Sequence, residues 1–171
     1  MTAQLADIQL LLLDVDGVLT DGSITYTDTG EQIKTFNAKD GLGIRLLMDA
    51  GIFVGIVTAR VSGALRHRCE NLGITLVFDG IRDKASALAS ISETTQVSTA
   101  QIAFMGDDLI DLPAMTRAGF AFTVADAPVE VKDRAHLITE LPGGKGAVRQ
   151  ACEAILKAKG LWENAISRFL L

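Results

Sequence analysis

The chain has 171 residues, of which 49% are hydrophobic and 22% are charged, and its formal net charge is −5. A chain of this length can bury a full hydrophobic core, so residues 1–171 are expected to form a single domain. The net negative charge argues against a nucleic-acid partner, and the apolar runs are too short for a membrane span. No secretion signal and no metal-type spacing of Cys69 and Cys152 is present, which predicts a cytoplasmic protein with reduced thiols.

The first apolar run, residues 10–13, ends in two carboxylates. Asp14 and Asp16 stand two positions apart, so on a strand their side chains point to the same side. They would project from the C-terminal end of a buried strand, which is where open α/β sheets bind ligands. Two carboxylates this close repel each other, and a hard cation such as Mg²⁺ would compensate their charge. Taken alone, the stretch is equally typical of a strand followed by an Asp-rich turn.

The next segment alternates polar and apolar residues on both sides of a turn. Residues 23–27 and 32–36 flank the turn-forming residues 28–30, a pattern that predicts a β-hairpin. Because the hairpin follows the paired carboxylates directly, we expect it to stand over them as a flap. A hairpin that only packs against the core is the alternative.

Apolar strands and amphipathic helices then alternate to the end of the chain. A helix is expected at 41–50, with Asp40 as its N-terminal cap and Gly51 as its stop. Further strands are expected at 52–58, 74–78, 101–105, 120–124 and 137–138, and further helices at 62–72, 84–91, 109–117, 129–134 and 146–159. Residues 160–171 form an apolar tail that we expect to contact another subunit. The alternation predicts an α/β fold, a Rossmann-like parallel sheet with helices on both faces.

Several of the expected strands end in polar side chains. In a parallel sheet these ends lie along one edge, and a helix that opens with a cation between them can reach the same crevice. The residues concerned are Asp14, Asp16, Thr58, Lys84, Asp107 and Asp108. They supply carboxylates for a metal, a hydroxyl, and an ammonium suited to phosphate oxygens. The chain has neither a GxGxxG nor a Walker-type phosphate loop.

These motifs resemble those of the haloacid dehalogenase (HAD) superfamily. Residues 14–20 match its opening motif DxDGxxT, Thr58 and Lys84 look like its second and third motifs, and residues 106–111 resemble its fourth. The segments 14–22, 40–43, 58–60 and 143–149 are together similar to small bacterial phosphatases of 3-deoxy-D-manno-octulosonate 8-phosphate (KDO 8-phosphate). Those enzymes are capless, and this chain likewise has no room for a cap domain.

The resemblance implies a Mg²⁺-dependent phosphomonoester hydrolase that releases KDO for lipopolysaccharide precursor synthesis. Asp14 would be the nucleophile that forms an aspartyl-phosphate, and Asp16 would act first as general acid and then as general base. Asp14, the backbone carbonyl of Asp16 and Asp107 would hold the metal. Thr58 and Lys84 would bind phosphoryl oxygens. Supporting positions are expected at Asp108 and at Asp111, which would orient Lys84 or a metal-bound water.

Substrate recognition and assembly are linked in these expectations. Arg60 suits the carboxylate or phosphate of the sugar acid. The flexible segment 143–146 would fold over a neighbouring chain's crevice, where Lys145 or Arg149 would contact the sugar. A plain surface loop before a helix is the alternative. A sheet edge with one short hairpin offers few contacts to a polar sugar and excludes little water from it. Neighbouring subunits are therefore expected to complete the site. The resemblance implies a homotetramer joined through the hairpins at 23–36.

Two alternatives to this reading stay open. The first is a phosphatase of a nine-carbon sugar acid, such as KDN 9-phosphate or a sialic acid 9-phosphate. In the related nine-carbon sugar phosphatases a Glu tends to stand where Arg60 is found, so Arg60 favours the eight-carbon acid. The second is a non-catalytic HAD-like domain that serves assembly, although such a domain has no need to keep Asp14, Asp16 and Asp107 together.

Overall fold

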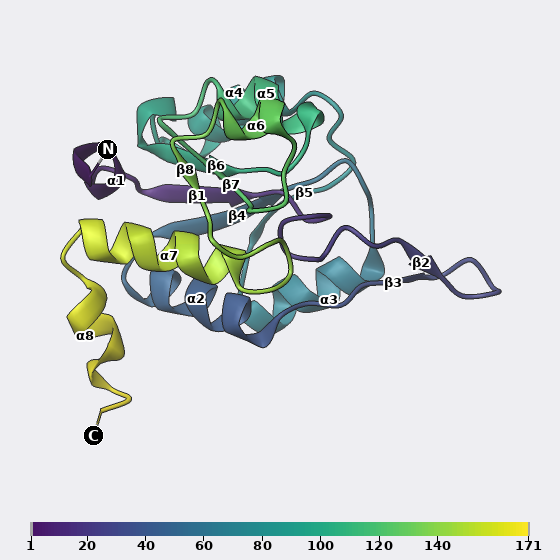
Figure 1. Ribbon diagram of the computed structural model, residues 1–171, viewed down its shortest axis with the longest axis horizontal. Helices are drawn as coiled ribbons and strands as arrows, with labels where there is room; N and C mark the ends of the chain where they lie inside the picture. Colours follow the sequence, from purple (N-terminus) through teal and green to yellow (C-terminus); the bar gives the residue numbers. More distant parts are fainter. Residues whose placement is uncertain (1, 171) are drawn as a thin grey trace.

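A parallel six-stranded sheet forms the centre of the molecule, as the computed structural model shows for residues 2–170 (Figure 1). The strand order is β5-β4-β1-β6-β7-β8, and every neighbouring pair is parallel. The strands are β1 (Leu10–Leu13), β4 (Phe53–Val57), β5 (Leu76–Phe78), β6 (Ile102–Met105), β7 (Phe120–Thr123) and β8 (Leu137–Ile138). The α/β fold expected from the sequence is confirmed.

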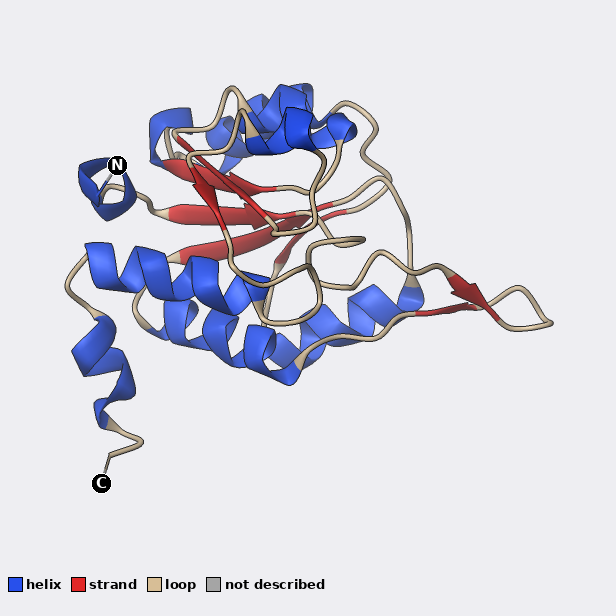
Figure 2. Cartoon of the chain, viewed as in Figure 1, coloured by secondary structure: helices blue, strands red, loops and turns tan. Residues whose placement is uncertain are grey.

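Helices cover both faces of the sheet (Figures 1 and 2). One face carries α2 (Ala38–Asp49), α3 (Gly63–Leu72) and α7 (Ala147–Ala158), and the other carries α4 (Lys84–Thr95), α5 (Leu112–Met115) and α6 (Val129–Lys132). Because both faces are covered, β1, β6 and β7 are buried along their whole length, which is why they read as continuous apolar runs. No separate cap domain is present among residues 2–170. None of the helices that these residues form combines the length and the hydrophobicity that a membrane span requires.

The chain order places a crevice beside β1. From β1 the chain adds β4 and then β5 on one side, and it crosses over to add β6, β7 and β8 on the other. The connection that leaves β1 therefore leads towards one edge of the sheet, and the connection that leaves β6 leads towards the other edge. The crevice between the ends of β1 and β6 is the topological switch point. The register pairs Leu13 with Met105, so the residues that follow these two strands emerge side by side.

The hairpin is shorter than the sequence predicts. Its strands, β2 (Thr25–Tyr26) and β3 (Gln32–Ile33), pair over two residues each and form a separate sheet that projects from the body of the molecule (Figure 2). An isolated two-stranded hairpin is only marginally stable, because no third strand or helix packs against it, so its pairing stays short. Ile24, Tyr26 and Ile33 are about half exposed on it.

Asp40 does not cap the helix in which it lies. The N-terminal cap of α2 is Asn37, whose side chain accepts a hydrogen bond from the Lys39 backbone N–H at 2.8 Å. Asp40 is buried inside α2, and its Oδ1 accepts a 2.8 Å hydrogen bond from the backbone N–H of Arg149 in the first turn of α7. The cap position of α7 is Gly146, which has no side chain to do this. Asp40 therefore caps a neighbouring helix.

The predicted helix at 109–117 and the predicted tail also differ from the structure. A 3₁₀ turn, η2 (Leu109–Asp111), precedes the short α5, because Asp108 and Asp111 cap each other's backbone at that point. The tail forms α8 (Trp162–Ser167), and Leu161, Trp162 and Ala165 pack against the core of their own chain. Leu171 lies outside the described residues. Two short elements, α1 (Thr2–Ala6) and η1 (Thr99–Gln101), were not expected from the sequence.

Replacing Asp40 with alanine is expected to lower the free energy of unfolding by about 1 kcal/mol, because the first turn of α7 loses its side-chain cap. Asp40→Asn keeps an oxygen at the same place and is expected to retain most of the stability. Urea unfolding of the two variants beside the wild type measures this difference. Equal free energies for Asp40→Ala and wild type would show that the bond to Arg149 contributes nothing.

Candidate active site

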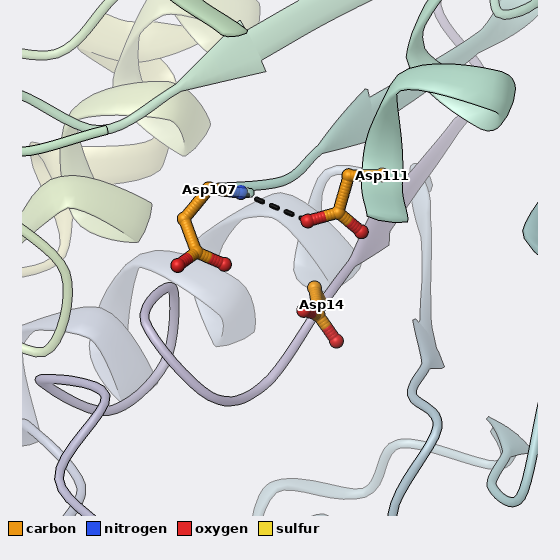
Figure 3. A group of neighbouring side chains, drawn as sticks. All are labelled: Asp14, Asp107 and Asp111. Carbon is orange, nitrogen blue, oxygen red and sulfur yellow. Dashed lines mark hydrogen bonds between the residues drawn. The ribbon is translucent and has the colours of Figure 1, made fainter. Parts of the chain in front are cut away.

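Three carboxylates meet at the switch point. Asp14 follows β1, Asp107 follows β6, and Asp111 ends η2, and Figure 3 shows their side chains converging. One oxygen from each lies within 4.8 Å of the others. We call these three residues the carboxylate cluster. The expected meeting of the β1 and β6 ends is present in the structure.

A glycine lets the two loops approach each other. Gly17 has φ +90°, a left-handed conformation that side chains disfavour, and a Cβ on it would overlap the carboxylate of Asp107. The turn that contains Gly17 is held by Val15, whose carbonyl accepts hydrogen bonds from the backbone N–H groups of Leu19 and Thr20 at 2.9 and 3.0 Å. The loop after β1 thereby lies directly against Asp107.

Asp111 links the carboxylate cluster to Lys84 and to the loop after β6 through its two oxygens. Its Oδ2 accepts hydrogen bonds from the backbone N–H groups of Asp107 at 3.0 Å, drawn in Figure 3, and of Asp108 at 3.3 Å. Its Oδ1 accepts a hydrogen bond from Lys84 Nζ at 2.6 Å. Lys84 also lies 3.0 Å from Asp14 Oδ1, and it is buried at the start of α4. Both oxygens of Asp111 therefore accept hydrogen bonds.

Negative charge exceeds positive charge in the cluster. Burial raises the pKa of Asp14 to about 6, and Asp111 adds to this rise while Lys84 opposes it. Burial also raises the pKa of Asp107 to about 8, with further contributions from Asp111 and Asp14. Within residues 2–170 no group donates a hydrogen bond to the Asp107 carboxylate. Carboxylate oxygens without a donor fit a hard divalent cation such as Mg²⁺.

Thr58 and Arg60 line a cleft together with Asp14 and Asp107. Thr58 directly follows β4 and is buried, and its Oγ1 accepts a 3.4 Å hydrogen bond from the backbone N–H of Arg60. The cleft has a volume of about 230 Å³ and is open to solvent. Its lining includes Asp14, Asp16, Thr58, Arg60, Asp107 and Asp108.

Asp16 lies in the cleft but outside the carboxylate cluster. Its Oδ1 accepts a hydrogen bond from Lys34, and its Oδ2 lies 3.6 Å from Arg60 Nε. Sequence reasoning missed Lys34. The alternation at 32–36 puts Lys34 on the face opposite Ile33, but a lysine on a hairpin is ordinarily solvated, so the pattern gives no sign that this one turns inward.

Lys145 is not brought into the cleft of its own chain. It is exposed, and its charge lowers the pKa of Asp21 only as a minor cause behind the bonds to Ser23. The segment 143–146, which we expected to be flexible, is held by hydrogen bonds. The Gly144 backbone N–H donates to the Val18 carbonyl at 3.0 Å, and the Gly143 N–H donates to Asp126 Oδ1 at 3.2 Å.

Comparison with known proteins places the chain among phosphatases. Residues 76–149 match the family model of haloacid dehalogenase-like hydrolases. The 3-deoxy-D-manno-octulosonate 8-phosphate phosphatase of Haemophilus influenzae is 44% identical over 94% of this chain and 89% of its own length. The Escherichia coli K12 protein of the same name is 41% identical over 95% of this chain and 87% of its own length.

Solved structures agree with the sequence relatives. The Moraxella catarrhalis 3-deoxy-D-manno-octulosonate 8-phosphate phosphatase, in complex with magnesium ion, phosphate ion and KDO, has a TM-score of 0.96 at 37% identity, covering 98% of this chain and 97% of that one. The cobalt-bound Haemophilus influenzae phosphatase has a TM-score of 0.93 at 42% identity, covering 98% and 99%. This chain therefore belongs to the 3-deoxy-D-manno-octulosonate 8-phosphate phosphatase family of haloacid dehalogenase-like hydrolases.

Proposed function

We propose that this chain hydrolyses KDO 8-phosphate to KDO and inorganic phosphate with the help of Mg²⁺, in lipopolysaccharide precursor synthesis. The observation that carries the proposal is the carboxylate cluster beside Lys84 and Thr58 at the switch point of a member of this family. The magnesium, phosphate and KDO bound by the Moraxella catarrhalis relative support it.

Asp14 is the nucleophile of the proposed reaction. Lys84 engages its Oδ1, which leaves Oδ2 to attack phosphorus. As the new Asp14 O–P bond forms, the bond between phosphorus and the sugar oxygen breaks, and its electron pair goes to that oxygen together with a proton from Asp16. Asp16 then takes a proton from water as the water oxygen attacks phosphorus and the Asp14 carboxylate leaves. The proton that Asp16 gives to the sugar oxygen is thereby recovered from the attacking water.

The remaining residues bind and orient the phosphoryl group. The Lys84 ammonium and the Thr58 hydroxyl donate to its oxygens, and Asp111 holds Lys84 in place. Asp14, Asp107 and the backbone carbonyl of Asp16 would hold Mg²⁺, which supplies neutralisation of charge between the carboxylates and the phosphate. Asp108 is the N-terminal cap of η2 and so helps to keep Asp111 in position.

Arg60 is the proposed contact for the sugar acid. Its side chain is 44% exposed at the cleft, so it can turn from Asp16 towards an incoming carboxylate and bind it with its planar fork. The preference for the eight-carbon substrate rests on the resemblance, because related nine-carbon sugar phosphatases tend to carry a Glu at this position.

A substrate panel tests the proposed function. Phosphate release from KDO 8-phosphate, KDN 9-phosphate and glucose 6-phosphate is measured with the purified chain in Mg²⁺ and in EDTA. We expect KDO 8-phosphate to have the highest kcat/KM and EDTA to abolish the reaction. A KDO 8-phosphate rate no better than that of the other substrates would refute the substrate assignment. Absence of turnover with every substrate would leave the chain as a non-catalytic domain.

A cytoplasmic location is part of the proposal. Cys69 and Cys152 are both free and buried, and burial raises the pKa of the Cys69 thiol to about 11. Free, unreactive thiols are the usual state of cysteine in a reducing compartment.

We also propose that the chain assembles as a homotetramer through its hairpins, and expect Tyr26→Glu to dissociate it. Ile24, Tyr26 and Ile33 expose apolar surface on a projecting ribbon, which association would cover. The matched control is Val129→Glu, because Val129 is an apolar residue of similar exposure on α6. Sedimentation velocity is expected to give a tetramer for wild type and Val129→Glu and a smaller species for Tyr26→Glu. A fully active wild-type monomer would contradict the shared site.

The role of Lys145 depends on that assembly. If Lys145 reaches the cleft of a neighbouring chain, Lys145→Ala raises the KM for KDO 8-phosphate in the tetramer without changing the sedimentation coefficient. An unchanged KM and kcat would remove Lys145 from the site.

A further inference from the structure

Lys34 is a buried cation that the proposed mechanism leaves unused. It directly follows β3 at the base of the hairpin, and its side chain is only 5% exposed. Its ammonium donates a hydrogen bond to Asp16 Oδ1, 18 residues earlier in the chain. Removing a lysine head group from water is costly unless it meets an opposite charge, so the site of Lys34 is built around Asp16.

This bond leaves the two oxygens of Asp16 in different surroundings. Oδ1 is taken by Lys34, whereas Oδ2 lies on the side of Arg60, 3.6 Å from its Nε. Arg60 and Asp16 both line the cleft, while Lys34 is not part of its lining. A carboxyl group held at one oxygen cannot rotate freely about its Cβ–Cγ bond. Oδ2 is therefore kept on the cleft side, where the leaving oxygen of a substrate would arrive.

We propose that Lys34 is a positioning residue that fixes the carboxyl group of Asp16 for proton transfer to the leaving group. The proposal rests on the proposed function, in which Asp16 is the general acid and base. Lys34 acts through Asp16 and does not itself contact the phosphoryl group. Because Lys34 belongs to the hairpin, the same bond ties the position of the hairpin to the acid–base residue.

The expected signature is a change in how the rate depends on the leaving group. A basic alkoxide or phenolate needs a proton as the bond to phosphorus breaks, whereas 4-nitrophenolate departs without one. The parameter kcat/KM covers only the steps up to the departure of the leaving group, so later hydrolysis of the aspartyl-phosphate does not obscure it. Phenyl phosphates lack the sugar acid, so contacts to the sugar do not contribute either.

The experiment compares Lys34→Met, Lys34→Arg and a control, Lys39→Met, with the wild type. Lys39 is an exposed lysine five residues away whose side chain makes no hydrogen bond in residues 2–170. Each protein is assayed in Mg²⁺ with a series of substituted phenyl phosphates, from 4-nitrophenyl to unsubstituted phenyl. For Lys34→Met we expect kcat/KM to fall about 100-fold with phenyl phosphate and less than about threefold with 4-nitrophenyl phosphate. Lys34→Arg should restore most of the loss, and Lys39→Met should match the wild type.

The outcomes separate this inference from the proposed function. A loss of equal size across the series, or no loss, in an active Lys34→Met protein would overturn the role of Lys34 and leave the phosphatase assignment standing. If Lys34→Met unfolds, the slope of the series in Lys34→Arg decides, because a positioning role requires it to stay close to that of the wild type. A wild-type protein that shows no Mg²⁺-dependent turnover would overturn both.

Discussion

Asp14→Asn abolishes phosphate release, with a fall in kcat of at least about 10⁴-fold, because the amide cannot form the aspartyl-phosphate. The fold is expected to survive this change. The asparagine side chain has nearly the same shape as the aspartate, and its oxygen can still accept a hydrogen bond from Lys84. The substitution also removes a buried carboxyl group whose pKa is raised to about 6. Phosphate release and thermal unfolding of the same preparation measure the two effects together.

Asp16→Asn is the companion variant. It leaves the nucleophile intact but removes the proton donor, so turnover should fall strongly while Asp14 can still be phosphorylated by a substrate with a good leaving group. Near-normal turnover in Asp14→Asn would rule out covalent catalysis at that residue. Normal turnover in Asp16→Asn would rule out its part as acid and base.

Lys84→Met has the second large effect, a loss of about 3–5 kcal/mol in the free energy of unfolding in EDTA. Lys84 lies between Asp14 and Asp111, at 3.0 and 2.6 Å, and the side chains of all three are almost completely buried. Without the ammonium, the cluster retains only negative charge. We expect turnover to fall by at least about 100-fold as well, because phosphoryl oxygens lose a charged donor.

The pH dependence of this loss follows from the raised pKa values. The carboxyl groups of Asp14 and Asp107, with pKa values of about 6 and about 8, bind protons more tightly in the folded than in the unfolded chain. In EDTA, the contribution of these two groups to the stability of the folded state is therefore greatest at low pH, and it falls as the pH rises through these values. The loss caused by Lys84→Met should grow in the same direction, and Mg²⁺ should recover part of it.

Urea unfolding of Lys84→Met and of Lys39→Met, in EDTA and in Mg²⁺, checks this prediction. Lys39 is exposed, so its replacement controls for the loss of one positive charge from the chain. Equal stability of the two variants would show that Lys84 does not balance the cluster.

The sheet and most of the candidate site could be predicted from the sequence because both depend on strands buried on two faces. Such strands are continuous apolar runs, and the residue that ends each run marks the sheet edge where ligands bind. Asp14 and Thr58 directly follow β1 and β4, and Asp107 follows β6 after one glycine. These residues could be predicted to lie close together because the carboxyl ends of parallel strands lie at the same edge of the sheet.

Features that depend on contacts between distant segments could not be predicted in this way. Asp40 has the sequence context of a helix start, but its partner is the backbone of Arg149, which the order of residues does not reveal. Lys34 has the context of a solvated hairpin residue, yet it turns towards Asp16. The last helix, α8, is only six residues long, and it is stabilised by the packing of Trp162 and neighbouring residues against the core.

Phosphate attached to Asp14 is the most direct test of the central claim, that this sheet edge performs covalent phosphoryl transfer. The Asp16→Asn variant is mixed with 4-nitrophenyl phosphate and Mg²⁺, quenched in acid within the first turnover, digested, and analysed by mass spectrometry. The account predicts a phosphorylated peptide containing residues 10–20 with the phosphate on Asp14, and none in Asp14→Asn. Phosphate on another residue, or release of 4-nitrophenol from wild type and Asp16→Asn without any phosphorylated Asp14, would contradict it.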